Sequence, residues 1–67
     1  MTRREQITAL LPDLVFVQDA RKKAKMPLEE AVGRLADAID WSLVDDAGNN
    51  LMAVLTHLRA ATKRAVA

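Results

Sequence analysis

Apolar residues recur with helical spacing in the middle of the chain. Between residues 27 and 44 they share one side of a helical wheel drawn at about 100° per residue. The members of this stripe are Leu28, Val32, Leu35, Ile39 and Leu43. Pro27, Glu29 and Glu30 suit a first helical turn, because proline needs no amide donor there and carboxylates favour the positive end of the helix dipole. The pattern predicts one continuous middle helix.

The preceding segment predicts a helix that is interrupted once. Thr2 and Glu5 have the spacing of a capping box, which favours a helix start near the N-terminus. Pro12 disfavours the α conformation in Leu11 and removes one helical hydrogen bond. Residues 3–11 are therefore either a short helix or the first half of a kinked one. The helix then continues to about Lys25.

A second stripe of helical period follows a polar turn over residues 45–50. Its members are Leu51, Val54, Leu55, Leu58, Ala61, Thr62 and Ala65. A β-hairpin over residues 41–44 and 51–55 is the alternative, but the apolar period after the turn is close to 3.6 and not to 2. We expect an all-α fold, with residues 1–67 forming a single helical domain. It is a small bundle of three helical segments, the first with a possible kink at Pro12.

The size of the chain limits its core. A domain of 67 residues buries only about 60% of the surface that its unfolded chain exposes. Small domains usually add disulfides, a metal or a partner subunit. The chain has no cysteine and one histidine, so it lacks the usual ligands of a structural zinc site. We therefore expect no cofactor and no metal, and a homodimer that completes the bundle.

Two groups of apolar residues fall outside the stripes. On a continuous middle helix, Trp41 lies about 200° from Ile39, among charged residues, with Val44 nearby. Tryptophan is enriched among binding hot spots. This position predicts a partner-binding face made of Trp41, Val44, Arg34 and Asp37. The alternative is that Trp41 folds over its own turn or under the first helix.

The second group is a run of four consecutive apolar residues. Such a run covers most of a helix circumference, so the helix must be buried on more than one side. The run predicts a self-association face made of Leu14, Val15, Phe16 and Val17. The alternative is that this helix lies at the centre of the bundle.

Residues able to carry catalysis are scarce. The chain has one serine, Ser42, and one histidine, His57, with no tyrosine or cysteine. A nucleophile and base also need an oxyanion hole, and no segment predicts one. Pairs such as Asp37 and Asp40 fall on a face that we expect to be solvated. We therefore expect no enzymatic activity.

Charge is unevenly distributed although the net charge is only +1. Six of the basic residues precede residue 27, and they form the candidate nucleic-acid surface. They are Arg3, Arg4, Arg21, Lys22, Lys23 and Lys25. No aromatic side chains alternate with this run, which argues against single-strand recognition. An acidic middle helix that attracts two basic neighbours within one bundle explains the same pattern, and we favour it.

These features together favour a small protein that acts by binding another protein. No apolar run approaches the roughly 20 residues that span a bilayer, and Arg3 and Arg4 precede polar residues and not the apolar core of a secretory signal. We expect a cytoplasmic regulatory or adaptor protein that does not bind membranes, of the kind that phages and plasmids use to inhibit a host regulator. A nucleic-acid-binding regulator and a structural subunit of a larger assembly are the alternatives.

Overall fold

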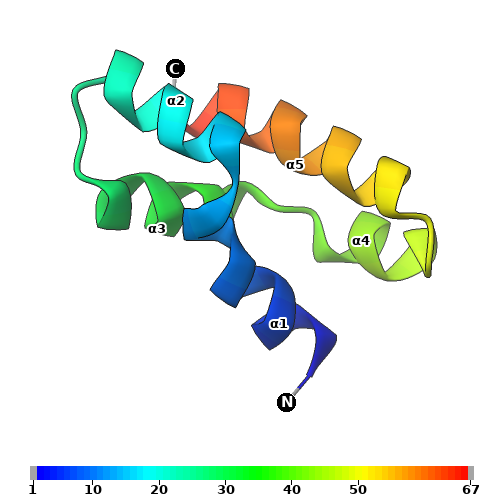
Figure 1. Ribbon diagram of the computed structural model, residues 1–67. Coiled ribbons are helices and arrows are strands. Elements are labelled where there is room, and N and C mark those ends of the chain that lie inside the picture. The colour runs from blue at the N-terminus through cyan, green and yellow to red at the C-terminus, as the bar shows by residue number, and fades with distance from the viewer. Residues whose placement is uncertain (1, 67) are drawn as a thin grey trace.

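The computed structural model describes residues 2–66, and all of their regular structure is helical (Figure 1). The elements are α1 (Arg3–Leu10), the 3₁₀ turn η1 (Leu11–Asp13), α2 (Val15–Lys23), α3 (Leu28–Ala38), α4 (Trp41–Ala47) and α5 (Leu51–Ala65). The all-α fold expected from the sequence is thus confirmed.

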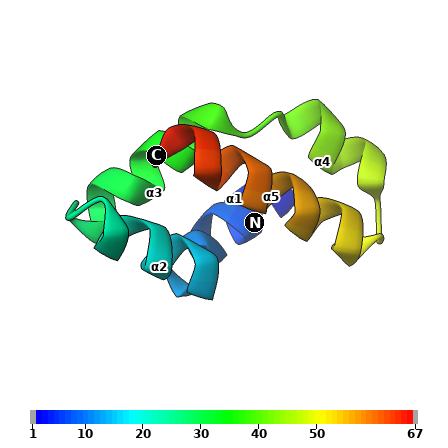
Figure 2. The same cartoon turned by 90° about the horizontal axis from the view of Figure 1, so that it is seen from above.

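Helix α5 is the element that the others share. Helices α2, α3 and α4 all pack against it, whereas α1 packs on η1. Figure 1 shows α1 pointing away from the other helices, and Figure 2 shows α2 and α4 at opposite ends of the molecule. The N-terminal helix is therefore peripheral to the bundle.

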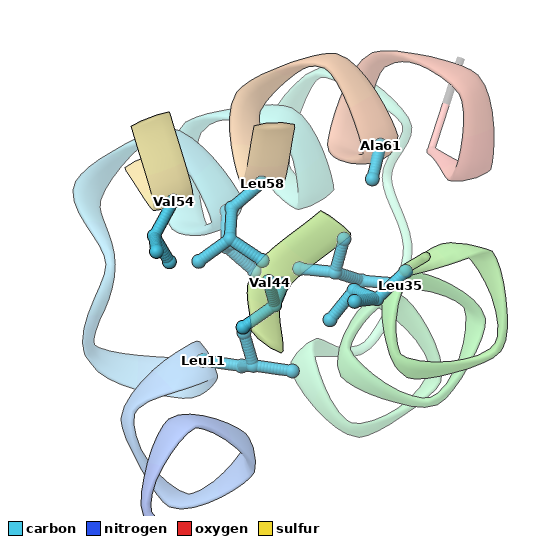
Figure 3. Close-up of a cluster of buried hydrophobic side chains, with 8 residues drawn as sticks. Leu11, Leu35, Val44, Val54, Leu58 and Ala61 are labelled. Atoms are coloured by element: carbon cyan, nitrogen blue, oxygen red, sulfur yellow. The ribbon is translucent and has the colours of Figure 1, made fainter. Parts of the chain in front are cut away.

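The core is one cluster of aliphatic side chains between these elements. Its members are Leu11, Val17, Leu35, Ile39, Val44, Val54, Leu58 and Ala61. Figure 3 shows Leu11 of η1 and Leu35 of α3 pointing toward Val54 and Leu58 of α5. The buried hydroxyl of Thr62 donates to the carbonyl oxygen of Leu58 at 2.7 Å, so no hydrogen-bonding group of that side chain is left unpaired.

The start of the chain follows the capping-box prediction. The backbone N–H of Glu5 donates to Oγ1 of Thr2 at 3.2 Å. The predicted interruption at Pro12 is real, but it separates two helices instead of kinking one. Leu14 is extended, with ψ of 127°, so α2 begins only at Val15.

The middle segment differs from its prediction. The expected continuous helix ends at Ala38, because Ile39 is extended with ψ of 131°. Asp40 then caps a new helix: its Oδ1 accepts from the backbone N–H groups of Ser42 and Leu43 at 3.0 and 3.3 Å. Aspartate is among the best N-cap residues. The stripe consequently stops at Ile39, and Leu43 is 53% exposed. Three helical segments are therefore not confirmed, because the first and the middle segment each form two helices.

His57 of α5 stabilises this break. The backbone N–H of Asp40 donates to Nε2 of His57 at 2.9 Å. An extended residue after a helix leaves backbone groups without helical partners, and the imidazole accepts one of them. The contact also fixes the junction between α3 and α4 to α5, seventeen residues away.

We expect His57→Phe to destabilise the fold by about 1 kcal/mol, the usual net value of one hydrogen bond. Phenylalanine keeps a ring and a similar helix propensity but offers no acceptor to Asp40. The melting temperature should fall by about 4–8 °C. Thr56→Val is the matched control, since the Thr56 hydroxyl bonds only Met52 of its own helix, and it should stay within about 0.5 kcal/mol of wild type. An unchanged melt of His57→Phe would contradict this role.

Candidate protein-binding site

Trp41 lies at the junction between α4 and α1. It is the first residue of α4, is half-buried, and packs against the core. The guanidinium carbon of Arg4 stands 5.6 Å from the centroid of its ring, within the range of a cation–π contact. Nη2 of Arg4 also donates to Oδ2 of Asp45 at 2.9 Å. Arg4 therefore joins the N-terminal helix to α4 at two points.

The partner-binding face predicted around Trp41 does not assemble as expected. Because α3 ends at Ala38, Arg34 and Asp37 do not share a helix with Trp41. Arg34 instead faces Glu30, with 3.7 Å between Nη2 and Oε1. Val44 is 1% exposed in the core, so it is not accessible to a partner. A binding role for the other three side chains stays a prediction.

A shallow hollow of about 520 Å³ lies beside Trp41. It is lined by Arg4, Glu5, Thr8, Ala9, Ala36 and Trp41. Its polar lining residues all belong to α1, whereas α3 and α4 contribute the apolar Ala36 and Trp41. Arg4 covers part of the indole ring and limits the area that another molecule could reach.

The four residues of the predicted self-association run lie in different environments. Val17 is fully buried in the core and cannot lie on a subunit interface. Phe16 is half-buried, with the Arg59 guanidinium carbon 5.5 Å from its ring centroid. Val15 is 69% exposed, and the half-buried Leu14 lines a groove. Helix α2 packs against both α3 and α5, and a self-association role for the exposed part of the run stays a prediction.

That groove runs between α1 and α5 and is mainly apolar. We call it the α1–α5 groove. It has a volume of about 640 Å³. Its lining residues are Arg3, Gln6, Ile7, Leu10, Leu14, Gly48, Asn49, Leu51, Val54, Leu55 and Leu58. Arg3 is the one charged side chain among them. Leu10 is 56% exposed and Leu51 is 69% exposed, so two large apolar side chains of the lining reach solvent.

The sequence analysis did not identify this groove, although a signal exists. Ile7, Leu10 and Leu14 follow one another at helical spacing, and the same three side chains line the groove. Its opposite wall comes from the turn before α5 and the first half of that helix. The pairing of these two segments depends on the turn at η1, and local periodicity does not determine that turn.

The predicted nucleic-acid residues do not form one surface. Arg3 and Arg4 belong to α1, and Arg4 is held by Trp41 and Asp45. Arg21, Lys22 and Lys23 lie at the C-terminal end of α2 and Lys25 lies just beyond it, far from α1 in Figure 1. Of these four, Lys23 lines a second groove of about 490 Å³ together with Arg59 and Lys63 of α5. This α2–α5 groove is lined by Phe16, Asp19, Ala20, Lys23, Arg59, Thr62, Lys63 and Val66.

Residues 2–66 contain no group of three or more side chains suited to hold a metal ion. Across the same residues, none of the helices combines the length and the apolar character needed to cross a membrane. Nε2 of His57, the atom that a serine–histidine pair would use, accepts the backbone N–H of Asp40.

Comparison with known proteins adds no family. No protein-family model matches the chain, no curated protein is significantly similar to it, and no solved structure shares its fold at a significant level. The assignment therefore depends on the geometry described above.

We expect Trp41→Ala to cost about 2 kcal/mol of stability, less than the 3–5 kcal/mol typical of fully buried aromatic side chains. The ring is half-buried and packs against the core, so its removal leaves apolar surface exposed. Thermal melts by circular dichroism should show a fall of roughly 8–16 °C.

Arg4→Ala is the matched comparison for Trp41→Ala. It removes the exposed cation that covers the ring and should cost no more than about 0.5 kcal/mol, because solvent screens exposed pairs. A Trp41→Ala variant that melts like wild type would show that the indole is not part of the fold, and would favour a role in partner binding.

Proposed function

We propose that this chain is a non-catalytic protein-binding protein, of regulatory or adaptor type, that acts by contact alone. The α1–α5 groove is the binding surface, and a second copy of the chain is its occupant. The observation that carries the proposal is the exposure of Leu10 and Leu51 at the rim of a groove whose lining has one charged residue.

The composition of the groove supports a protein contact. Burial of apolar surface contributes about 25 cal/mol per Å², so covering Leu10 and Leu51 is favourable. Interface cores are depleted in charged residues, and the lining contains Arg3 but no carboxylate. Permanent dimer interfaces are also more apolar than transient ones. The groove resembles the permanent class.

The low intrinsic stability of the short helix α1 favours a second copy of the chain over another protein as the occupant of the groove. Helix α1 has eight residues and no buried residue. Isolated helices shorter than about 12–15 residues are marginal in water, and in α1 only Ile7 packs on the core and only Arg4 contacts α4, so a permanent cover would stabilise α1. A second copy is present whenever the chain is made, whereas a transient partner would leave α1 uncovered. The small size of the domain favours the same solution.

A dimer interface would have to extend beyond the α1–α5 groove itself. A specific interface buries about 600–800 Å² on each partner, roughly one-eighth to one-sixth of the 4548 Å² accessible surface of this chain. Such an interface uses about 20 residues a side. The lining residues of the groove supply about half of that number. Exposed neighbours in the sequence, such as Met52, extend the surface. A two-fold axis lets each copy offer the same surface to the other.

We expect sedimentation equilibrium at micromolar concentration to give about twice the chain mass of 7.4 kDa. Leu51→Lys should shift the protein to the monomer, because a lysine would be buried in an apolar contact. At a hot spot the loss is about 2 kcal/mol or more, at least thirtyfold in the dissociation constant.

Val15→Lys is the matched control for Leu51→Lys. Val15 and Leu51 are each the first residue of a helix, and each is 69% exposed. Only Leu51 lines the groove, so Val15→Lys should remain a dimer. If Val15→Lys dissociates the dimer while Leu51→Lys does not, association uses the face predicted from the sequence. A wild-type monomer at every concentration would overturn the proposal.

A further inference from the structure

Helices α2 and α5 run in the same direction, and their C-terminal ends lie at the same end of the molecule (Figures 1 and 2). The contact of Arg59 with Phe16, and the presence of Lys23 and Val66 in one groove, fix this parallel register. Two basic segments that are far apart in the sequence therefore meet. We call this surface the basic end. Its members are Arg21, Lys22, Lys23, Lys25, Arg59, Lys63 and Arg64.

The basic end gives the molecule an uneven charge distribution. Asp19 of α2 lies among its seven cations, and Glu29 and Glu30 follow in the first turn of α3, so this end has a formal charge of +4. The other residues contain three basic and six acidic side chains, a formal charge of −3, which together restores the net +1. The near-neutral total therefore conceals a concentrated positive surface.

Contacts within the chain do not neutralise these cations. The two ion pairs among residues 2–66 join Arg4 to Asp45 and Arg34 to Glu30. Cations in a last helical turn are favoured by the helix dipole, which accounts for part of the cluster. It does not account for Arg59, which lies in the middle of α5, nor for Lys25, which lies beyond α2. Like charges so close together repel, and a polyanion would relieve that repulsion.

We infer that the basic end binds the phosphate backbone of double-stranded nucleic acid without reading its sequence. Single strands are bound largely by stacking on exposed aromatic rings, and the one ring here, Phe16, is half-buried beside Arg59. Membrane-surface helices place exposed bulky apolar residues beside their cations. In α2 and α5 the large exposed apolar residues are Val15, Leu51 and Met52, all in the first turns and away from the basic end.

The dimensions fit a phosphate backbone. The two shorter axes of the molecule measure 22 and 18 Å, and a duplex carries one charge per roughly 1.7 Å of its length. A duplex segment of this length carries about ten to thirteen phosphates on its two strands together, of which part faces the protein. Lys23, Arg59 and Lys63 line the α2–α5 groove and would make the main contacts with the phosphates. Asp19 lines the same groove, and its carboxylate would repel them. With about four phosphate contacts, the log–log slope of affinity against salt is about −4.

This inference does not depend on the proposed dimer, because the two surfaces use different halves of α5. Leu51 to Leu58 line the α1–α5 groove, and Arg59 to Val66 line the α2–α5 groove. Failure of one therefore leaves the other to be tested separately.

The test is fluorescence anisotropy of the whole chain with a labelled 20-base-pair DNA duplex of mixed sequence. Affinity should fall by about two orders of magnitude between 50 and 200 mM NaCl. A second duplex of unrelated sequence should bind within about threefold. The double variant Lys23→Gln with Lys63→Gln should bind at least tenfold more weakly at 100 mM NaCl and reduce the salt slope by about 2.

The matched control is Arg4→Gln with Arg34→Gln, which removes the same charge from outside both the basic end and the α1–α5 groove and should change affinity less than twofold. Equal losses in both double variants would assign the binding to net charge and overturn the proposed surface. Absence of duplex binding at 50 mM NaCl would overturn it too. So would tighter binding to a single strand of equal charge, or binding to phosphatidylserine vesicles in place of DNA.

Discussion

The apolar stripe of α5 is the surface against which the rest of the molecule packs. Val54, Leu58 and Ala61 form one wall of the core, and α2, α3 and α4 cover that wall from different sides. One fifteen-residue helix offers a limited apolar area, and these three helices use it. Helix α1 has no buried residue, and Ile7 is its one side chain that packs on the core; the α1–α5 groove is the consequence.

The break between α3 and α4 lets the chain cover both ends of α5. A straight helix through residues 28–47 would extend about 30 Å, longer than the roughly 22 Å of α5. Ile39 stays in the core, Asp40 caps α4, and His57 accepts the amide released at the break. The same break places Trp41 next to α1, where Arg4 contacts its ring.

The sequence predicted the fold class, the N-cap at Thr2, the interruption at Pro12 and the position of the last helix, because these follow from local spacing. It missed the break at Ile39, since the apolar period continues to Leu43 without interruption and only the capping ability of Asp40 opposes it. The error carried into the candidate site, where Arg34, Asp37 and Trp41 were placed on one helical face. The two grooves were not predictable, because each joins segments whose approach depends on tertiary packing.

The central claim is that α1 is held in place by a second copy of the chain. Amide hydrogen exchange of α1 tests it directly, because exchange reports local opening. At high protein concentration the amides of α1 should be protected. On dilution below the dissociation constant they should exchange at least tenfold faster, while the amides around Leu58 to Thr62 keep their protection. Protection of α1 that is the same at every concentration would contradict the account.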